Sequence, residues 1–495
     1  MDNQRKFRLI PGSNTAQLVL FVLFVIWIAI SIIVRMEWLV FIPAFVLLSL
    51  LLLLDIKWIY YILILTIPLS IELEFGGLSL DAPDEIICIF LFLITPGAIL
   101  LNYRKWDWGF LRHPIVMILG AMAAVSIMAT LQSTNVVLSI KYLLAKAWYI
   151  IAYFGCTVLF LRKPKDIRFM SWLAVISCTI TIMYVVVRHA GTGFSFNEIN
   201  YMVGPFYSNH VNYAVQMVAI IPFLWLLWRH YKKIKMIHWL LFGLMILFIC
   251  AIYLSYTRAA ILTLILSLGF YYVIQWKLVK PAFWLAIIGS IAFSMYMVRD
   301  DRFFELAPDF NKTITQQQFD RLITATYNLE DISTMERVYR WVAARYMIPD
   351  RPLLGVGPNN FYDNYKPYTI NSFRTYVSDN PEHSTVHSYI LLLAIEQGIP
   401  AALLFLALIY FTLISLQTTY HSYTDRESKL AIMAAGICFF NLIMVLLIND
   451  VVESDKEGSF FYISLAIIAS MHYRFIKRKA KAQSDEPQLE NPSYF

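Results

Sequence analysis

Histidines and arginines in the second half of the chain are of the types that could catalyse transfer of a group to a hydroxyl. His383 and His387 come just before an apolar run. A histidine at such a boundary is partly desolvated, titrates near neutral pH and can accept a proton from an attacking hydroxyl. The alternative is a histidine that only hydrogen-bonds a neighbouring carbonyl. This alternative is stronger for His383, which lies further from the apolar run.

Three arginines provide a second chemical feature. Arg258 lies where two apolar runs meet with almost no loop between them, and Arg337 and Arg340 are three residues apart. The second pair is predicted to share one helix face. A guanidinium can bind two phosphate oxygens at once, so these residues predict a phosphate site. The alternatives are snorkelling of Arg258 to headgroups, and solvated ion pairs of Arg337 and Arg340 with Glu336 or Asp331.

Two weaker groups are candidates for substrate binding. Lys141 and Lys146 lie near the start of an apolar run, where they could meet lipid phosphate or simply mark the membrane interface. Asn209, His210 and Asn212 come before another apolar run and could hydrogen-bond sugar hydroxyls. An asparagine-rich segment is also common where a helix begins. We include these five residues with Arg340 and His383 as predicted substrate-binding residues.

Motifs of several enzyme classes are absent from the sequence. It contains no HExxH, no Walker loop, no GxSxG and no CxxC, and its five cysteines all lie inside apolar runs. Zinc proteolysis, ATP hydrolysis and esterase chemistry are therefore unsupported. No acidic pair is well placed to hold a metal beside a pyrophosphate, so we expect neither metal nor cofactor, and arginines would have to bind the phosphates.

The composition predicts a membrane protein. Apolar residues make up 59% of the chain and charged residues 15%, against about 45–50% and about 25% in soluble domains. The net charge of +7 lies in short loops between apolar runs, which indicates membrane orientation rather than nucleic-acid binding. The runs predict an all-α polytopic fold with about 12–14 transmembrane helices, at roughly 15–34, 38–54, 58–71, 86–101, 114–131, 139–161, 169–187, 211–228, 237–254, 259–276, 281–298, 388–416, 430–449 and 459–475.

Lysine and arginine concentrate in alternate loops, so both termini are predicted to face the cytoplasm. We divide the chain into helices 1–11 (1–298), a periplasmic loop domain (299–387), C-terminal helices (388–475) and a cytoplasmic tail (476–495). A polar loop as long as 299–387 is more often functional than idle, and it holds short helical patterns such as STMERVYRWVAARYMI.

Three motifs resemble the O-antigen ligase and O-antigen polymerase superfamily of bacterial membrane glycosyltransferases. They are SYTRAAIL, ERVYRWVAARYMIPDRPLLGVGPNNF and HSTVHSYILLLAIEQGIP, and GPFYSNHVNYA is also similar to the polar start of a central helix in that family. The similarity covers roughly 200–405. One departure is Ser388, where many relatives have asparagine; serine can still form a hydrogen bond.

The resemblance implies transfer of a glycan from an undecaprenyl pyrophosphate carrier without nucleotide or metal. It implies that Arg258 and Arg337 bind the pyrophosphate and that His387 lies beside the acceptor hydroxyl. Family members differ in the acceptor, which is lipid A core for a ligase, another lipid-linked repeat for a polymerase, or a protein hydroxyl for an oligosaccharyltransferase. We place the ligase first and the polymerase second. A lipid or solute transporter is the alternative from another class, and it predicts ionisable residues at mid-membrane and related halves.

Overall fold

The computed structural model describes residues 55–75, 78–101, 103–306, 332–374, 378, 380 and 384–484. The predicted helices at 15–34 and 38–54, and His383, lie outside these ranges. The predicted helical pattern QQQFDRLITATYNL, at 316–329, also lies outside them. The division into four segments drawn from the sequence stays a prediction.

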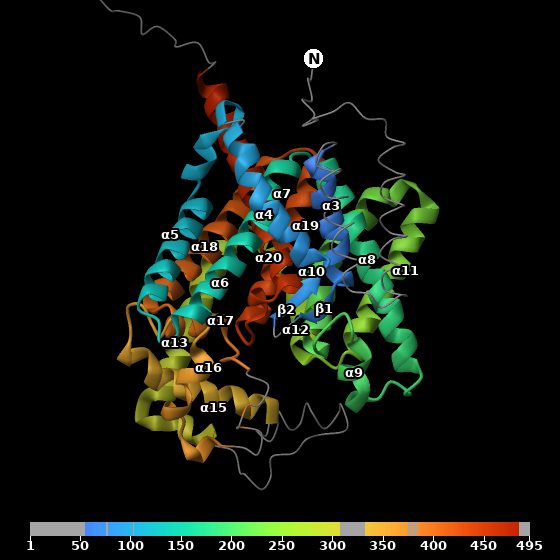
Figure 1. Cartoon of the computed structure of the whole chain (residues 1–495). Helices are drawn as coiled ribbons and strands as arrows, with labels where there is room; N and C mark the ends of the chain where they lie inside the picture. The colour runs from blue at the N-terminus through green and yellow to red at the C-terminus, as the bar shows by residue number, and fades with distance from the viewer. Residues whose placement is uncertain are drawn as a thin grey trace, which may run out of the picture.

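The described chain is a bundle of long apolar helices, which confirms the predicted all-α polytopic membrane fold (Figure 1). Within the described ranges, eleven helices are long and apolar enough to cross a membrane. They are α4 (Asp84–Leu101), α5 (Pro114–Leu131), α6 (Val136–Tyr149) with its continuation to Phe160, α8 (Pro164–Ala190), α10 (His210–His230), α11 (Lys235–Leu254), α12 (Arg258–Gln275), α13 (Val279–Val298), α18 (Ile399–Ser422), α19 (Arg426–Leu446) and α20 (Asp455–Ser484).

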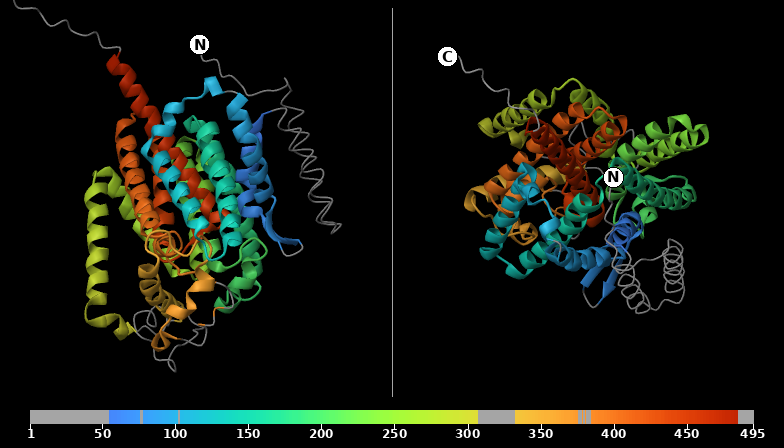
Figure 2. Two further views of the ribbon diagram at one scale, coloured as in Figure 1. Left: turned by 60° about the vertical axis from the view of Figure 1, so that its left-hand side comes forward. Right: turned by 90° about the horizontal axis from the view of Figure 1, so that it is seen from above.

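Helices α10, α19 and α20 form the centre of the bundle, and most of the side chains in their apolar stretches are buried. Helix α13 lies at the edge, with almost all of its side chains exposed (Figure 2). A helix that is apolar on all sides is either inside a protein or in contact with lipid. The shorter α3 (Ile56–Thr66) packs beside α8 and α4. The core is therefore built around α10, α19 and α20.

The two ends of the bundle differ in charge. At one end, which we call the basic end, Arg168 pairs with Glu427 at 3.0 Å and Arg426 donates to the carbonyl of Arg229. At the other end, which we call the loop end, lie α15 (Ile332–Met347) and α16 (Phe361–Asn364) (Figure 1). The structure thus groups loops that the positive-inside pattern assigns to one side of the membrane.

Two local features differ from the sequence prediction. Residues predicted as an acidic loop form an antiparallel hairpin, β1 (Ile71–Phe75) with β2 (Leu78–Ala82). The predicted single helix at 388–416 is two helices, α17 (Tyr389–Glu396) and α18, because Gly398 adopts a left-handed φ of +84° between them. Apolar periodicity does not detect this break, since both helices are apolar.

Candidate active site

Two glycine motifs build the base of the site at the loop end. The amide of Gly357 donates to the carbonyl of Glu396 at 2.8 Å, and the amide of Ile399 donates to the carbonyl of Pro352 at 2.8 Å. Gly355 and Gly398 both have positive φ, and a Cβ at Gly398 would overlap the carbonyl of Leu353. The PLLGVG and EQGIP segments therefore pack backbone to backbone, which requires glycine.

Glu396 joins the same two motifs through its side chain. Its carboxylate accepts the amides of Asn359 at 2.8 Å and Phe361 at 3.0 Å, while its side chain is almost fully buried. Burial raises the pKa of this carboxyl to about 8, and the backbone hydrogen bonds oppose that increase. Glu396 therefore holds the start of α16 against α17.

The amphipathic helix α15 carries Arg337 and Arg340. Met335, Val338 and Val342 are buried on one side of this helix. Arg340 is 4% exposed and pairs with Glu336 at 3.3 Å, so the predicted pairing partner is correct but the pair is buried rather than solvated. Arg337 is only partly buried, and its Nε donates to the carbonyl of Ile448 at 3.3 Å.

Helix α15 also holds the segment that ends at His387. Nη1 of Arg340 donates to the carbonyl of Thr385 at 3.1 Å, and Nε1 of Trp341 donates to the carbonyl of Val386 at 3.1 Å. His387 follows directly, with a left-handed φ of +52° that is uncommon for any residue but glycine. The backbone on the N-terminal side of His387 is thus fixed by two side chains of α15.

The electrostatic environment of His387 shows that the two arginines lie near its imidazole. Burial, and to a smaller extent the positive charges of Arg337 and Arg340, together lower the pKa of His387 to about 3, while a hydrogen bond with Asn449 acts in the opposite direction. Nδ1 of His387 is buried and has no hydrogen-bond partner within the described part of the chain. The imidazole is therefore neutral at pH 7 and able to accept a proton.

Arg258 is the first residue of α12, at the same end of the bundle. Helices α12 and α19 run antiparallel, and the rings of Phe270 and Phe440 stack with centroids 4.0 Å apart. From this pair, Arg258 lies twelve residues, or about 18 Å, toward the loop end, whereas Leu446 lies only six residues, or about 9 Å, in that direction. Arg258 therefore lies about 9 Å further toward the loop end than Leu446, the last residue of α19. Residues 447–454, which connect α19 to α20, are called the 447–454 turn below.

The predicted polar cluster ahead of α10 adjoins Arg258. Oδ1 of Asn209 caps the helix by accepting the amide of Asn212 at 2.9 Å, and Nδ1 of His210 contacts Oδ1 of Asn200 at 2.6 Å. The hydroxyl of Thr257 donates to the carbonyl of His210 at 3.3 Å. The local contacts explain Asn209 as a helix cap, and they place the cluster beside the start of α12.

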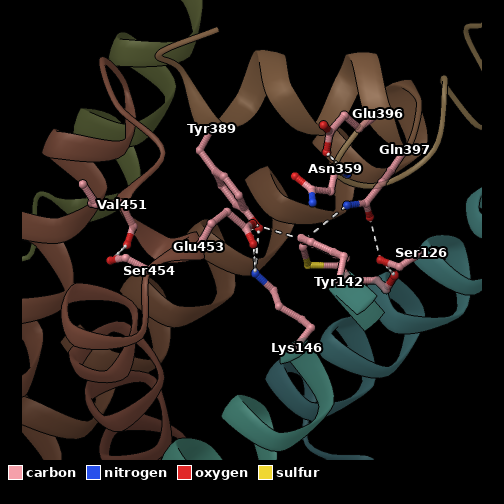
Figure 3. Close-up of polar contacts among 11 residues, drawn as sticks. Ser126, Tyr142, Lys146, Asn359, Tyr389, Glu396, Gln397, Val451, Glu453 and Ser454 are labelled. Carbon is pink, nitrogen blue, oxygen red and sulfur yellow. Dashed lines mark hydrogen bonds and ion pairs between the residues drawn. The ribbon is translucent and has the colours of Figure 1, made fainter. Parts of the chain in front are cut away.

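The two lysine candidates lie in different surroundings, and Figure 3 shows those of Lys146. Nζ of Lys146 pairs with Glu453 at 2.9 Å and lies within 6 Å of the ring centroids of Tyr142, Tyr389 and Tyr462. Lys141 is exposed on the same helix. Lys146 therefore points into the protein beside α17, the helix that begins two residues after His387. Lys141 does not.

The sequence reasoning missed several residues of this region. Asn449, Asp450 and Glu453 belong to the 447–454 turn and contact His387, Thr385 and Lys146 respectively. The only signal for them was an acidic segment between two apolar runs, which does not reveal contacts more than 60 positions away. In the part of the chain that the structure describes, no group of three or more His, Cys, Asp or Glu could hold a metal ion.

Part of this region is similar to a known protein family. A family model described as O-Antigen ligase matches residues 243–406. The match includes α12, α15, α17 and the two glycine motifs, and it contains Arg258, Arg337 and His387. Comparison with curated proteins found no match.

Proposed function

We propose that this chain, which carries the domain of the O-antigen ligase superfamily at residues 243–406, transfers a glycan from undecaprenyl pyrophosphate to an acceptor hydroxyl on the periplasmic side of a bacterial inner membrane. The observation that carries the proposal is that α15, which bears Arg337 and Arg340, is hydrogen-bonded through Arg340 and Trp341 to the two residues that directly precede His387. A neutral imidazole beside two permanent cations suits a reaction in which a hydroxyl loses a proton and a pyrophosphate departs.

The reaction is a displacement at the anomeric carbon of the first sugar of the donor. The acceptor oxygen forms a bond to this carbon, the bond from the carbon to the pyrophosphate oxygen breaks, and the acceptor proton passes to His387. The bonding electrons leave with undecaprenyl pyrophosphate. Arg258 and Arg337 stabilise the negative charge that develops on the leaving oxygen. Arg340 acts differently, because its guanidinium is held by Glu336 and Thr385.

Binding of the anionic donor would also make the imidazole of His387 a stronger base. The two nearby guanidinium groups lower the pKa of His387 in the protein alone. A pyrophosphate bound by Arg258 and Arg337 would offset this repulsion and raise that pKa toward its ordinary value. The imidazole would then accept the proton more readily when the donor is bound. Proton transfer would therefore depend on the presence of the donor.

We propose lipid A core as the acceptor, in line with the description of the matched family. A growing polysaccharide and a protein hydroxyl are the other acceptors that the same chemistry would serve. Lys146 with its surrounding tyrosines, and the cluster of Asn209, His210 and Asn212, are the proposed sugar- and phosphate-binding groups. Lys141 and His383 remain proposals for contacts with the substrate or lipid headgroups.

The test is transfer in reconstituted vesicles. Purified protein receives a lipid-linked glycan and lipid A core, and products are separated by mass. We expect a glycan–core product with the natural protein and a rate lower by about 10²–10⁴ with His387→Ala. Normal transfer by His387→Ala would remove this assignment. Movement of intact donor across the vesicle membrane without a covalent product would favour a transporter. Offering the other two acceptors separately would identify a polymerase or a protein oligosaccharyltransferase.

A further inference from the structure

The 447–454 turn contacts three separate parts of the site. The carbonyl of Ile448 accepts a hydrogen bond from Arg337, and Oδ2 of Asp450 accepts one from the hydroxyl of Thr385 at 2.7 Å. Glu453 pairs with Lys146 of α6. Glu453, like the rest of the turn, lies outside the residues that match the family model. A segment from another part of the chain therefore completes the surroundings of His387.

Thr385 is held on both of its hydrogen-bonding groups. Its carbonyl accepts from Arg340 at 3.1 Å, and its hydroxyl donates to Asp450. The same hydroxyl oxygen lies 3.4 Å from the backbone nitrogen of His387 and accepts its amide hydrogen. The chain of contacts therefore runs from the Asp450 carboxylate, through the Thr385 hydroxyl, to the backbone of His387.

The backbone at His387 needs such support. A left-handed φ at a residue with a side chain is unfavourable and persists only where the surroundings fix it. The direction of the imidazole from the backbone depends on that conformation, so a change at residue 385 would move the imidazole relative to Arg337. Asp450 is half-buried and is placed to prevent this change.

We propose that Asp450 is a positioning residue for His387 and acts through the hydroxyl of Thr385. This inference rests on the proposed role of His387 as the proton acceptor. Asp450 touches neither the imidazole nor the reacting atoms in this arrangement. Asn449, the neighbouring residue, hydrogen-bonds the imidazole itself, so two successive residues of the turn fix the side chain and the backbone of His387.

The test compares removal and conservation of the one hydrogen bond in the vesicle assay. We expect Asp450→Ala and Thr385→Val each to lower kcat about 10- to 100-fold while the KM for the lipid-linked donor stays within about twofold, because the base is misplaced but the donor site is intact. Asp450→Asn and Thr385→Ser keep an acceptor and a hydroxyl, so both should retain most of the activity. The Asp450→Ala/Thr385→Val double variant should lose no more than the more damaging single change, because both remove the same contact.

The matched control is Asp425→Ala, which removes the cap at the other end of α19, where Oδ2 of Asp425 accepts the amide of Ser428 at 2.8 Å. It should lower thermal stability and leave kcat per folded molecule unchanged. The inference is overturned if Asp450→Ala has normal kcat, if its loss only follows the amount of folded protein, or if the two single losses add. An active His387→Ala would instead overturn the proposed function.

Discussion

Arg340 donates to the carbonyl of Thr385 across 45 residues of sequence, at 3.1 Å, so the helix that carries Arg337 also fixes the segment that ends at His387. The second arm of the same guanidinium pairs with buried Glu336, whose other oxygen accepts the hydroxyl of Ser378 at 2.6 Å. Arg340 is thus held by these structural contacts, whereas Arg337 is the arginine of α15 that we propose to contact the substrate.

The first prediction concerns this buried pair. Arg340→Met removes the cation that pairs with the buried Glu336 carboxylate, so we expect a loss of about 3–5 kcal/mol in unfolding free energy. Arg345→Met is the control, because Arg345 pairs with Asp301 on the surface at 3.5 Å. That change should cost less than about 1 kcal/mol. Thermal unfolding in detergent measures both, and equal losses would contradict a structural role for Arg340.

The second prediction concerns pH. Burial and the two nearby arginines hold the pKa of His387 at about 3, so the free protein already has a neutral imidazole well below pH 6. We expect kcat/KM to stay level as the pH falls from 7 to about 5, since kcat/KM reports the free enzyme. An ordinary histidine would lose activity near its usual pKa of about 6.5.

Arg337→Gln extends the pH prediction. Removing this positive charge raises the pKa of His387, so the acidic fall of the residual kcat/KM should move to higher pH. Arg351→Gln is the control, because that side chain lies at an exposed position on the loop end. A pH profile of the residual activity that is unchanged in Arg337→Gln would show that Arg337 does not act on the imidazole.

The fourth prediction concerns Arg258. Arg258→Lys keeps the charge but cannot offer two parallel donors to a phosphate, so transfer should fall by about tenfold or more with little change in thermal stability. Arg299→Lys is the matched control, since Arg299 is highly exposed at the end of α13. The rate of glycan transfer at saturating acceptor is measured for the Arg258→Lys and Arg299→Lys variants. Natural activity in the Arg258→Lys variant would show that charge alone suffices there or that the donor binds elsewhere.

The fifth prediction concerns Gly398. An alanine at this position would need a left-handed φ and would overlap the carbonyl of Leu353, so Gly398→Ala should destabilise the protein by about 1–3 kcal/mol and separate the two glycine motifs. Gly243→Ala is the control, because a Cβ there meets no atom within 4 Å. In a helix interior this control should be neutral or slightly stabilising. Comparable unfolding temperatures for the two variants would contradict the argument.

The sequence by itself determined the membrane helices, because apolar length and the placement of basic residues depend only on local composition. It also indicated Arg337 and His387, since a guanidinium and an imidazole have few substitutes in phosphate binding and proton transfer. The periodicity of STMERVYRWVAARYMI predicted α15, which the structure confirms.

Only the tertiary structure decided which polar groups meet. Arg337 and Arg340 are the same residue type on one helix, yet only Arg340 is packed into the interior, where it pairs with the buried Glu336 one turn away. Lys146 finds Glu453, and Thr385 finds Asp450, across long stretches of chain. A hydrogen bond acts over about 3 Å, whereas a sequence pattern reports only neighbours along the chain, so these partners follow from packing of the helices and not from any local signal.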